Sequence, residues 1–317
     1  MEEELTKKNR HREVLITLLI SFLFMGVGFF LTYQTDPLNL STQNEKKERE
    51  AVAEQARISG LKQNFFGHLK LEAKAYIIYN SETGEIVAGR NEKKILPLAS
   101  LTKVMTVLAT SEQIGPNTNI TIGNNIDENA TTLRKGERWQ MANLAALTLV
   151  SSSNEGAEAL AEAAATSSAA LVEIMNQKAK SLNLNSFHFI NPTGLDENYL
   201  PGGVGTALDV AKLFSYVLKN KPELLSATKE SSVSEQDSSG LTHNVLNTNT
   251  AVNEIPGLFA GKTGYTDLAG GNLAVAANIG LHRPLIFVVL GSSKEGRFSD
   301  TKKLTEATFK YYAQINK

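Results

Sequence analysis

The chain has no cysteine among its 317 residues, which excludes disulfide bonds, a thiol nucleophile and cysteine-ligated zinc. The five histidines are scattered and show no spacing typical of metal ligands, so we predict no metal site. An excess of charge is also absent, because 32 Lys and Arg residues balance 33 Asp and Glu residues to a formal net charge of -1. This balance gives no indication of nucleic-acid binding, and we expect no nucleic-acid partner.

Charge is missing altogether from residues 14–33, VLITLLISFLFMGVGFFLTY. About 20 apolar residues are the length that a helix needs to cross a bilayer. Four basic residues precede this segment and no Lys or Arg occurs in the ten residues after it, which predicts a cytoplasmic N-terminus at 1–13. We therefore predict a single transmembrane anchor at 14–33, with the rest of the chain outside. A cleaved signal peptide is the alternative, although QTDPLNL offers no small-x-small cleavage site.

Residues 34–70 are polar and contain the charged run NEKKEREAVAEQAR, so we expect a spacer that is either a solvated linker or an exposed helix. A folded domain is expected at 71–317. It opens with AYIIYNSETGEIVAGR, in which two β-rich runs flank a turn that ends in Gly84, a pattern typical of a hairpin. After Gly257 we expect three further short strands, followed by a closing amphipathic helix in RFSDTKKLTEATFKYYAQ.

Helix-forming segments fill the middle of this domain, whereas Ser-, Thr- and Asn-rich residues 221–250 predict irregular structure. The helices are expected at 98–114, in MANLAALTLV, in EGAEALAEAAATS, and at about 168–182 and 206–219. Because helices do not alternate with strands, we predict one α+β domain with an antiparallel sheet of about five strands flanked by helices. The N-terminal hairpin should pair beside the C-terminal strands.

Ser100 and Lys103 open the helix predicted from residue 98, and residues three apart share one face of a helix. A lysine can take a proton from a serine only if burial or a second cation lowers its pKa. The burial would come from the flanking residues Leu98, Leu101, Val104 and Met105. The Ser-x-x-Lys pattern alone also fits a helix cap followed by a surface lysine. It occurs in polar surroundings at Ser59, Ser226 and Ser299.

The triplet Ser152-Ser153-Asn154 lies at the expected break between two helices, where a hydroxyl and an amide could point into a cleft. An N-cap at Ser153 or Asn154 explains it equally well. Lys262-Thr263-Gly264 lies in a predicted strand. An ammonium and a hydroxyl side by side suit a substrate carboxylate, and Gly264 would let that substrate approach the backbone. An exposed lysine on an edge strand is the alternative.

Taken in order, these motifs form the signature of penicillin-recognising serine acyl-transferases. Four blocks make it specific: LPLASLTKVMT, TLVSSSNEGAEALAE, FHFINPTGLDENYLPGGVGTALDVAKL and GLFAGKTGYTDLAGGNLAVAA. Between about residues 70 and 295 the chain resembles the D-alanyl-D-alanine carboxypeptidases, the low-molecular-mass penicillin-binding proteins. The resemblance implies the fold of serine β-lactamases and penicillin-binding-protein transpeptidases, with 71–317 as the catalytic domain. It also implies a bacterial membrane. Many members of the family carry a small β-rich domain and a C-terminal amphipathic helix that binds the membrane, whereas here the expected anchor is N-terminal and we expect no accessory domain after the closing helix.

The resemblance further implies a role for each motif residue. Ser100 would attack the penultimate D-alanine carbonyl of a peptidoglycan stem peptide, Lys103 would take its proton, and Ser152 would pass a proton to the leaving amine. Asn154, Lys262 and Thr263 would bind the peptide and its carboxylate, and the N–H groups of Ser100 and Tyr265 would form the oxyanion hole beside Gly264. β-Lactam antibiotics would acylate Ser100, and no cofactor is required.

Three other functions share these motifs. A D,D-endopeptidase that cleaves cross-links would carry all three. A β-lactamase would need a carboxylate that activates the deacylating water, for which Asp196 and Glu197 are the candidates. A membrane-tethered cell-wall sensor would keep the pocket without turnover, although it would not need a nucleophile and a base.

Overall fold

The computed structural model describes residues 37–123, 132–280 and 283–315, together with a few isolated helical residues between 16 and 25. Most of the expected anchor at 14–33 lies outside the described residues. Among those that are described, no helix has both the length and the apolar character required to span a bilayer. The chain divides into two compact units, Met1–Gly60 and Leu61–Lys317.

Apart from the isolated residues between 16 and 25, the described part of the first unit is the greater part of helix α2, which runs from Pro37 to Phe66. Its side chains from residue 44 to Gly60 are almost all exposed, and its composition is rich in Glu, Lys, Ala and Gln, which favour helix. An ion pair of 2.7 Å joins Arg57 to Glu54 one turn earlier. Of the two forms expected for the spacer, the structure has the exposed helix.

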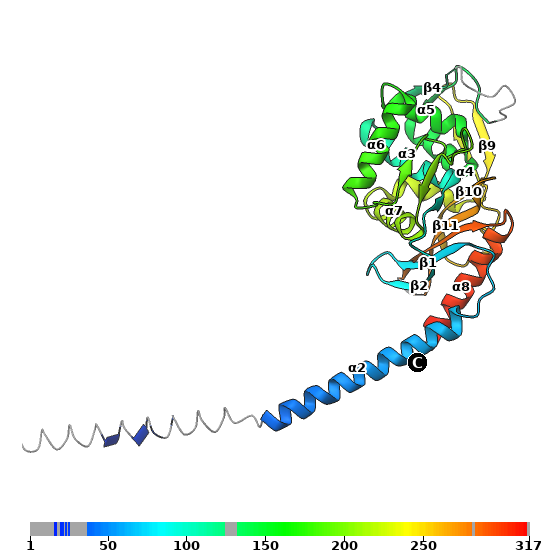
Figure 1. Cartoon of the computed structure of the whole chain (residues 1–317). Coiled ribbons are helices and arrows are strands. Elements are labelled where there is room, and N and C mark those ends of the chain that lie inside the picture. The colour runs from blue at the N-terminus through cyan, green and yellow to red at the C-terminus, as the bar shows by residue number, and fades with distance from the viewer. Residues whose placement is uncertain are drawn as a thin grey trace, which may run out of the picture. The chain divides into compact units, whose positions relative to one another are not determined.

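A five-stranded antiparallel sheet forms the centre of the second unit, in the order β10-β11-β12-β1-β2 (Figure 1). The strands are β1 (Ala75–Asn80), β2 (Ile86–Arg90), β10 (Leu258–Thr266), β11 (Gly270–Asn278) and β12 (Pro284–Ser292). The N-terminal hairpin pairs with the C-terminal strands through β1 and β12, with Ala75 opposite Leu290. The predicted antiparallel sheet of five strands and the placement of its hairpin are therefore confirmed.

Both faces of this sheet are buried, so its central strands are apolar at nearly every position. Ile77, Ala274 and Val288 face one core, which they share with helices, whereas Ile78 and Phe287 face a second core. Figure 1 shows α8 (Gly296–Ile315) and the larger group of helices on opposite sides of the sheet. The larger group comprises α3 (Thr102–Gln113), α4 (Met141–Ser151), α5 (Asn154–Ala164), α6 (Ser168–Ser181) and α7 (Ala207–Asn220).

Short elements complete the unit. They are β3 (Leu96–Pro97), β4 (Asn119–Thr121), β5 (Arg138–Gln140), β6 (His188–Phe189), β7 (Gly203–Gly205), the 3₁₀ turn η1 (Ala99–Leu101) and the 3₁₀ helix η2 (Pro222–Lys229). Strands β8 (Ser232–Gln236) and β9 (Thr242–Leu246) form a hairpin. The prediction of irregular structure at 221–250 is therefore wrong for much of that segment. The hairpin was missed because only Val233 and Val245 mark its inward side among polar residues.

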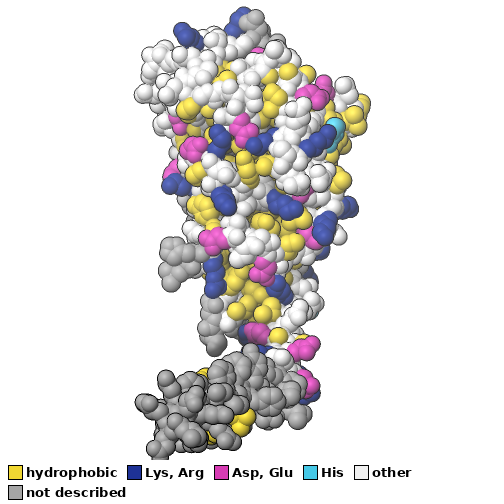
Figure 2. Space-filling model, turned by 90° about the vertical axis from the view of Figure 1, so that its left-hand side faces the viewer, with side chains coloured by type: hydrophobic (Ala, Val, Ile, Leu, Met, Phe, Trp, Pro, Cys, Tyr) yellow, Lys and Arg dark blue, Asp and Glu magenta, His cyan; other side chains and the backbone are white. Residues whose placement is uncertain are grey.

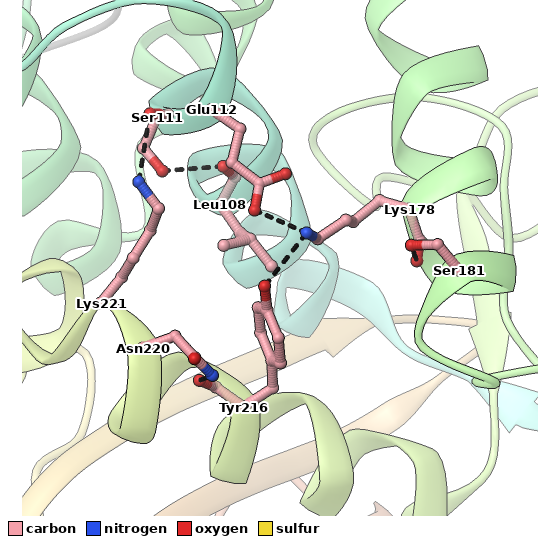
Figure 3. Close-up of polar contacts among 8 residues, drawn as sticks. All are labelled: Leu108, Ser111, Glu112, Lys178, Ser181, Tyr216, Asn220 and Lys221. Carbon is pink, nitrogen blue, oxygen red and sulfur yellow. Dashed lines mark hydrogen bonds and ion pairs between the residues drawn. The ribbon is translucent and has the colours of Figure 1, made fainter.

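A polar network joins the C-terminal end of α3 to α6 and α7 (Figure 3). The ammonium of Lys178 lies 2.6 Å from a carboxylate oxygen of Glu112 and donates to the hydroxyl of Tyr216 at 3.2 Å. Burial lowers the pKa of Lys178, but these two partners outweigh it and leave that pKa raised. Lys221 donates to the carbonyl of Ser111 at 3.3 Å. The network fixes the helix whose opposite end carries Ser100 and Lys103.

Charged side chains of both signs are interspersed over the face of the protein shown in Figure 2. This distribution agrees with the near-zero net charge of the whole chain.

Candidate active site

A tight turn at the start of α3 presents Ser100. The turn is η1, in which Ala99 has φ +50°, a left-handed conformation that is uncommon for a residue with a side chain. The helix expected from residue 98 therefore begins as a 3₁₀ turn. Leu98 and Leu101 anchor the turn at 1% and 2% exposure. Ser100, between them, is only partly buried.

Lys103 is fully buried and has three hydrogen-bond acceptors. Its ammonium donates to Ser100 Oγ at 2.9 Å, Asn154 Oδ1 at 2.7 Å and the carbonyl of Thr193 at 2.8 Å. The serine and lysine of the first motif therefore meet as their spacing predicts. Asn154 of the second motif contacts the same ammonium, so two of the three motifs converge on one atom.

Burial lowers the pKa of Lys103 from 10.5 to about 7, although the charges of Glu155 and Glu158 act in the opposite direction. The apolar surroundings predicted from Leu98, Leu101, Val104 and Met105 are present, and all four are at most 2% exposed. A lysine with this pKa is neutral in about half of the molecules near pH 7, so its nitrogen can accept a proton there.

The second motif occupies the break between α4 and α5, where the sequence placed it. Ser152 has φ +63° and ends α4. Ser153 is the N-cap of α5, because its hydroxyl accepts from the backbone N–H of Gly156 at 3.0 Å. The capping explanation therefore applies to Ser153, while its neighbours Ser152 and Asn154 contact the two lysines.

Lys262 lies on β10 and is 1% exposed, so it is not the exposed lysine of an edge strand. Its ammonium donates to Ser152 Oγ at 2.8 Å and to the carbonyl of Thr263 at 2.9 Å. Burial lowers its pKa well below 10.5, and the charges of Lys103 and Arg297 lower it further. Burial is therefore the largest cause of the lowered pKa at both lysines, and the charge of Lys103 is a further cause at Lys262.

Gly264 lies against the turn that holds Ser100. A Cβ atom at this position would come within 2.8 Å of the carbonyl of Leu98 and 3.2 Å of the backbone nitrogen of Ser100. Only glycine lets the strand approach this closely. Tyr265, the next residue of β10, is 43% exposed, and Lys294 lies over its ring at 5.5 Å.

The three other Ser-x-x-Lys pairs have different partners. Lys62 and Lys302 bind Glu85 and Glu254, respectively. Ser226 and Ser299 donate to backbone carbonyls within their own turns. Among the described residues, the Ser100 pair is therefore distinguished by both its burial and its direct contact.

A pocket of about 410 Å³ opens beside the site, and its lining includes Asn154 and Thr193. Four acidic residues complete much of its wall, namely Glu155, Glu158, Asp196 and Glu197. Glu158 has a raised pKa, first because it is buried and further because Glu162 and Glu197 lie nearby. Asp196 is engaged elsewhere, since its carboxylate accepts from Thr266 Oγ1 at 3.0 Å and from the N–H of Leu268 at 3.1 Å.

Several residues of the site were not predicted from the sequence. Thr248 Oγ1 lies 2.6 Å from Thr263 Oγ1, and Arg297 donates to the carbonyl of Gly264 at 2.8 Å. The side chain of Asn272 bridges the carbonyl of Pro97 and the N–H of Gly291. No local pattern marks these three, because their partners are distant in sequence. Thr193 and Asn272 lie within the sequence blocks quoted above, although neither residue was assigned a role.

The sequence predicted no metal site. Among the described residues, one group of three side chains has the spacing of metal ligands: Glu137, Asp237 and His243. This group shares no residue with the Ser100 site. That the Ser100 site requires no cofactor remains a prediction.

The chain is similar to known proteins in both sequence and fold. Over 256 residues the chain is 31% identical to the D-alanyl-D-alanine carboxypeptidase DacD of Salmonella typhimurium. The matched region covers 74% of this chain and 62% of that protein. It thus spans less than two thirds of the length of this relative. Two solved structures cover 76% of the chain. The D-alanyl-D-alanine carboxypeptidase of Mycobacterium tuberculosis superposes with a TM-score of 0.69 at 26% identity, over 92% of its own chain.

The second structure is penicillin-binding protein D2 of Listeria monocytogenes in its cefotaxime-bound form, with a TM-score of 0.68, 30% identity and 99% of that chain covered. These likenesses confirm the predicted penicillin-binding-protein fold. The family of D-alanyl-D-alanine carboxypeptidases called peptidase S11 matches residues 62–294. The matched segment contains Ser100 and Lys103 at the start of α3 as well as Lys262 on strand β10. The chain is therefore a member of this peptidase S11 family.

Proposed function

We propose that this protein is a serine D,D-carboxypeptidase that removes the terminal D-alanine from peptidoglycan stem pentapeptides. The observation that carries the proposal is the 2.9 Å contact between Ser100 Oγ and the buried Lys103, whose pKa is about 7. A hydroxyl paired with a neutral amine is an activated nucleophile. Family membership specifies the acyl group that this nucleophile attacks.

Acylation begins when Ser100 Oγ forms a bond to the carbonyl carbon of the penultimate D-alanine and its proton passes to Lys103 Nζ. The backbone N–H groups of Ser100 and Tyr265 stabilise the negative charge that develops on the carbonyl oxygen. The close approach of Gly264 to the backbone of Ser100 supports this assignment, because it brings strand β10 alongside the nucleophile. A single donor of this kind commonly contributes a factor of about 10²–10³ to kcat.

The leaving amine then receives a proton through Ser152, which is hydrogen-bonded to Lys262. Collapse of the tetrahedral intermediate breaks the C–N bond and leaves the acyl group on Ser100. Water subsequently cleaves that ester and regenerates the hydroxyl. No metal or cofactor takes part in this sequence of steps.

Lys262 and Thr263 hold the free carboxylate of the substrate, and Asn154 binds its peptide backbone. Strand β10 lies at the end of the sheet, where an extended peptide can pair with it. The anion would restore the charged form of Lys262, whose pKa is depressed while the lysine is buried without a carboxylate partner. Selectivity for a free C-terminus follows from this pairing of opposite charges.

β-Lactams would acylate Ser100 for the same reason, since they resemble the D-Ala-D-Ala terminus. Penicillin-binding protein D2 of Listeria monocytogenes has been captured in cefotaxime-bound and ampicillin-bound forms, which supports this proposal. A β-lactamase is less well supported, because each carboxylate oxygen of Asp196 already accepts a hydrogen bond, one from Thr266 and one from Leu268.

The membrane location is part of the proposal. The uncharged segment 14–33 would anchor the chain with residues 1–13 in the cytoplasm. Residues 34–70, much of which form the exposed helix α2, would act as a spacer, and 71–317 would be the catalytic domain on the outer side of a bacterial membrane. Peptidoglycan is a substrate outside the cytoplasmic membrane, so this placement would bring enzyme and substrate together.

Release of D-alanine from a pentapeptide that ends in D-Ala-D-Ala tests the proposal. We expect release by the wild type and none above background by Ser100→Ala. Ser226→Ala is the matched control, because Ser226 begins another Ser-x-x-Lys pattern but is exposed. Full activity in Ser100→Ala would refute the nucleophile. Cleavage of cross-linked muropeptides without D-alanine release would identify an endopeptidase instead.

A further inference from the structure

Three side chains from two separate antiparallel hairpins, β4–β5 and β8–β9, converge on one point. Glu137 directly precedes β5, Asp237 directly follows β8, and His243 lies on β9. One ligand atom from each residue lies within 4.8 Å of the ligand atoms of the other two. The turn that carries Asp237 is held to the neighbouring hairpin by the N–H of Ser238, which donates to the carbonyl of Arg138 at 2.6 Å. The three residues are therefore brought together by the packing of the hairpins.

The ring of His243 is oriented for ligation. Its Nδ1 lies 3.2 Å from the carbonyl of Thr132, and a carbonyl can only accept, so Nδ1 carries a hydrogen in this contact. In the neutral ring, Nε2 then presents its lone pair. Nε2 is buried and has no hydrogen-bond partner among the described residues. Hydrogen bonding of one ring nitrogen to a carbonyl is the usual support of a metal-ligating histidine.

Glu137 supplies a buried oxygen to the same point. Its side chain is 9% exposed, and Oε2 accepts from Trp139 Nε1 at 3.2 Å. Oε1 is buried, has no hydrogen-bond partner among the described residues, and lies 3.7 Å from His243 Nε2. This separation is too long for a hydrogen bond. It is close to the roughly 3.4 Å expected between two ligands that bind one tetrahedral zinc ion at about 2.1 Å.

Asp237 is also held in a fixed orientation. It is 8% exposed, and its Oδ1 accepts from the N–H of Ser239 at 2.8 Å, the hydroxyl of Ser239 at 2.6 Å and the N–H of Leu241 at 3.0 Å. These bonds all go to one oxygen, which leaves Oδ2 as the atom for a cation. The hairpin turn therefore positions the carboxylate before any ion arrives.

We infer that Glu137, Asp237 and His243 form a binding site for one divalent transition-metal ion, with zinc as the favoured occupant. Calcium and magnesium prefer ligand sets made of oxygen alone, whereas zinc readily combines imidazole nitrogen with carboxylate oxygen. Water would complete the coordination. The ion would fasten hairpin β8–β9 to hairpin β4–β5. The chain continues from β9 to Thr248, whose hydroxyl contacts Thr263 in the candidate active site.

Zinc titration of the full-length chain in detergent, after treatment with a chelator, tests the inference. Competition with a chromophoric zinc chelator should show one equivalent of zinc bound and a higher melting temperature in its presence. His243→Gln should weaken zinc binding by about 100-fold or more, since loss of even an outer-sphere partner costs about 10–100-fold. His188→Gln is the matched control, because His188 is exposed, and it should bind zinc like the wild type.

Wild-type binding weaker than about 10 µM, or equal zinc affinity in His243→Gln, would overturn the inference. Circular dichroism establishes that each variant is folded. If His243→Gln does not fold, anomalous scattering at the zinc edge from crystals of the zinc-loaded wild type decides the question. An ion between Glu137, Asp237 and His243 supports the site, and zinc located only elsewhere refutes it.

Discussion

At the scale of single residues, the pKa of Lys103 should set the pH range of the proposed reaction. Its pKa of about 7 results mainly from burial, and proton acceptance requires its neutral form. The acid limb of the kcat/KM profile should therefore rise through pH 7, rather than through the range near 10.5 expected of an exposed lysine. The pH dependence of D-alanine release from the pentapeptide measures this limb.

Replacing Glu155 tests the direction in which the acid limb should move. Its negative charge stabilises the ammonium form of Lys103, so Glu155→Gln should lower the pKa of Lys103 and move the acid limb to lower pH. Glu173→Gln is the control, because Glu173 is exposed and its charge is not a cause of the Lys103 shift. A limb that moves to higher pH in Glu155→Gln would contradict the assignment of Lys103 as base.

Gly264 is the residue at which backbone space limits activity. In Gly264→Ala the new methyl group would lie 2.8 Å from the carbonyl of Leu98, so strand or turn must shift. We expect kcat/KM to fall by at least about 10-fold, since small displacements of reacting groups cost this much or more. Gly60→Ala, where a Cβ meets no atom within 4 Å, should leave the steady-state kinetics unchanged. Wild-type kinetics in Gly264→Ala would refute this packing argument.

At the scale of elements, the polar network that joins α3, α6 and α7 should contribute to stability. Glu112→Gln removes the carboxylate that lies 2.6 Å from Lys178, and the side chains of the two are 25% and 17% exposed. For a pair that is partly accessible to water we expect a loss of about 1 kcal/mol. This corresponds to a melting temperature about 3 °C lower.

Tyr216→Phe provides the second arm of this test. It removes the 3.2 Å hydrogen bond from Lys178 and keeps the ring, over which the ammonium lies at 4.9 Å. A double-mutant cycle with Glu112→Gln should reveal coupling, because both residues bind the same ammonium. Strictly additive losses in thermal unfolding would show that the two contacts are independent.

Elements with a strong local pattern could be predicted from the sequence. The hairpin at β1–β2, the strands after Gly257 and the helix break at Ser152 all agree with the structure. The 3₁₀ turn before α3 was not predicted, because alanine is a strong helix former and Ala99 therefore favoured a continuous helix. In the structure Ala99 has a left-handed conformation. Thr248 and Arg297 could not be predicted as site residues, since the fold alone brings them to β10.

At the scale of the whole molecule, the proposed anchor makes a prediction about fractionation. The full-length chain should sediment with membranes and resist extraction by alkaline carbonate, because segment 14–33 is long enough to span the bilayer. A chain that begins after residue 33 should be recovered in the soluble fraction. Recovery of the full-length chain in a soluble form shortened near residue 33 would instead establish the cleaved signal peptide.

The end position of β10 in the sheet has a consequence for self-association. An uncovered edge strand invites pairing with another copy and hence aggregation. Here β10 packs against η1 and η2, and the N–H of Gly261 donates to the hydroxyl of Thr228 in η2 at 3.0 Å. These contacts cover part of the free edge of β10. If β10 pairs with an extended peptide as proposed, this partial cover would admit a short ligand and oppose growth of the sheet into fibrils.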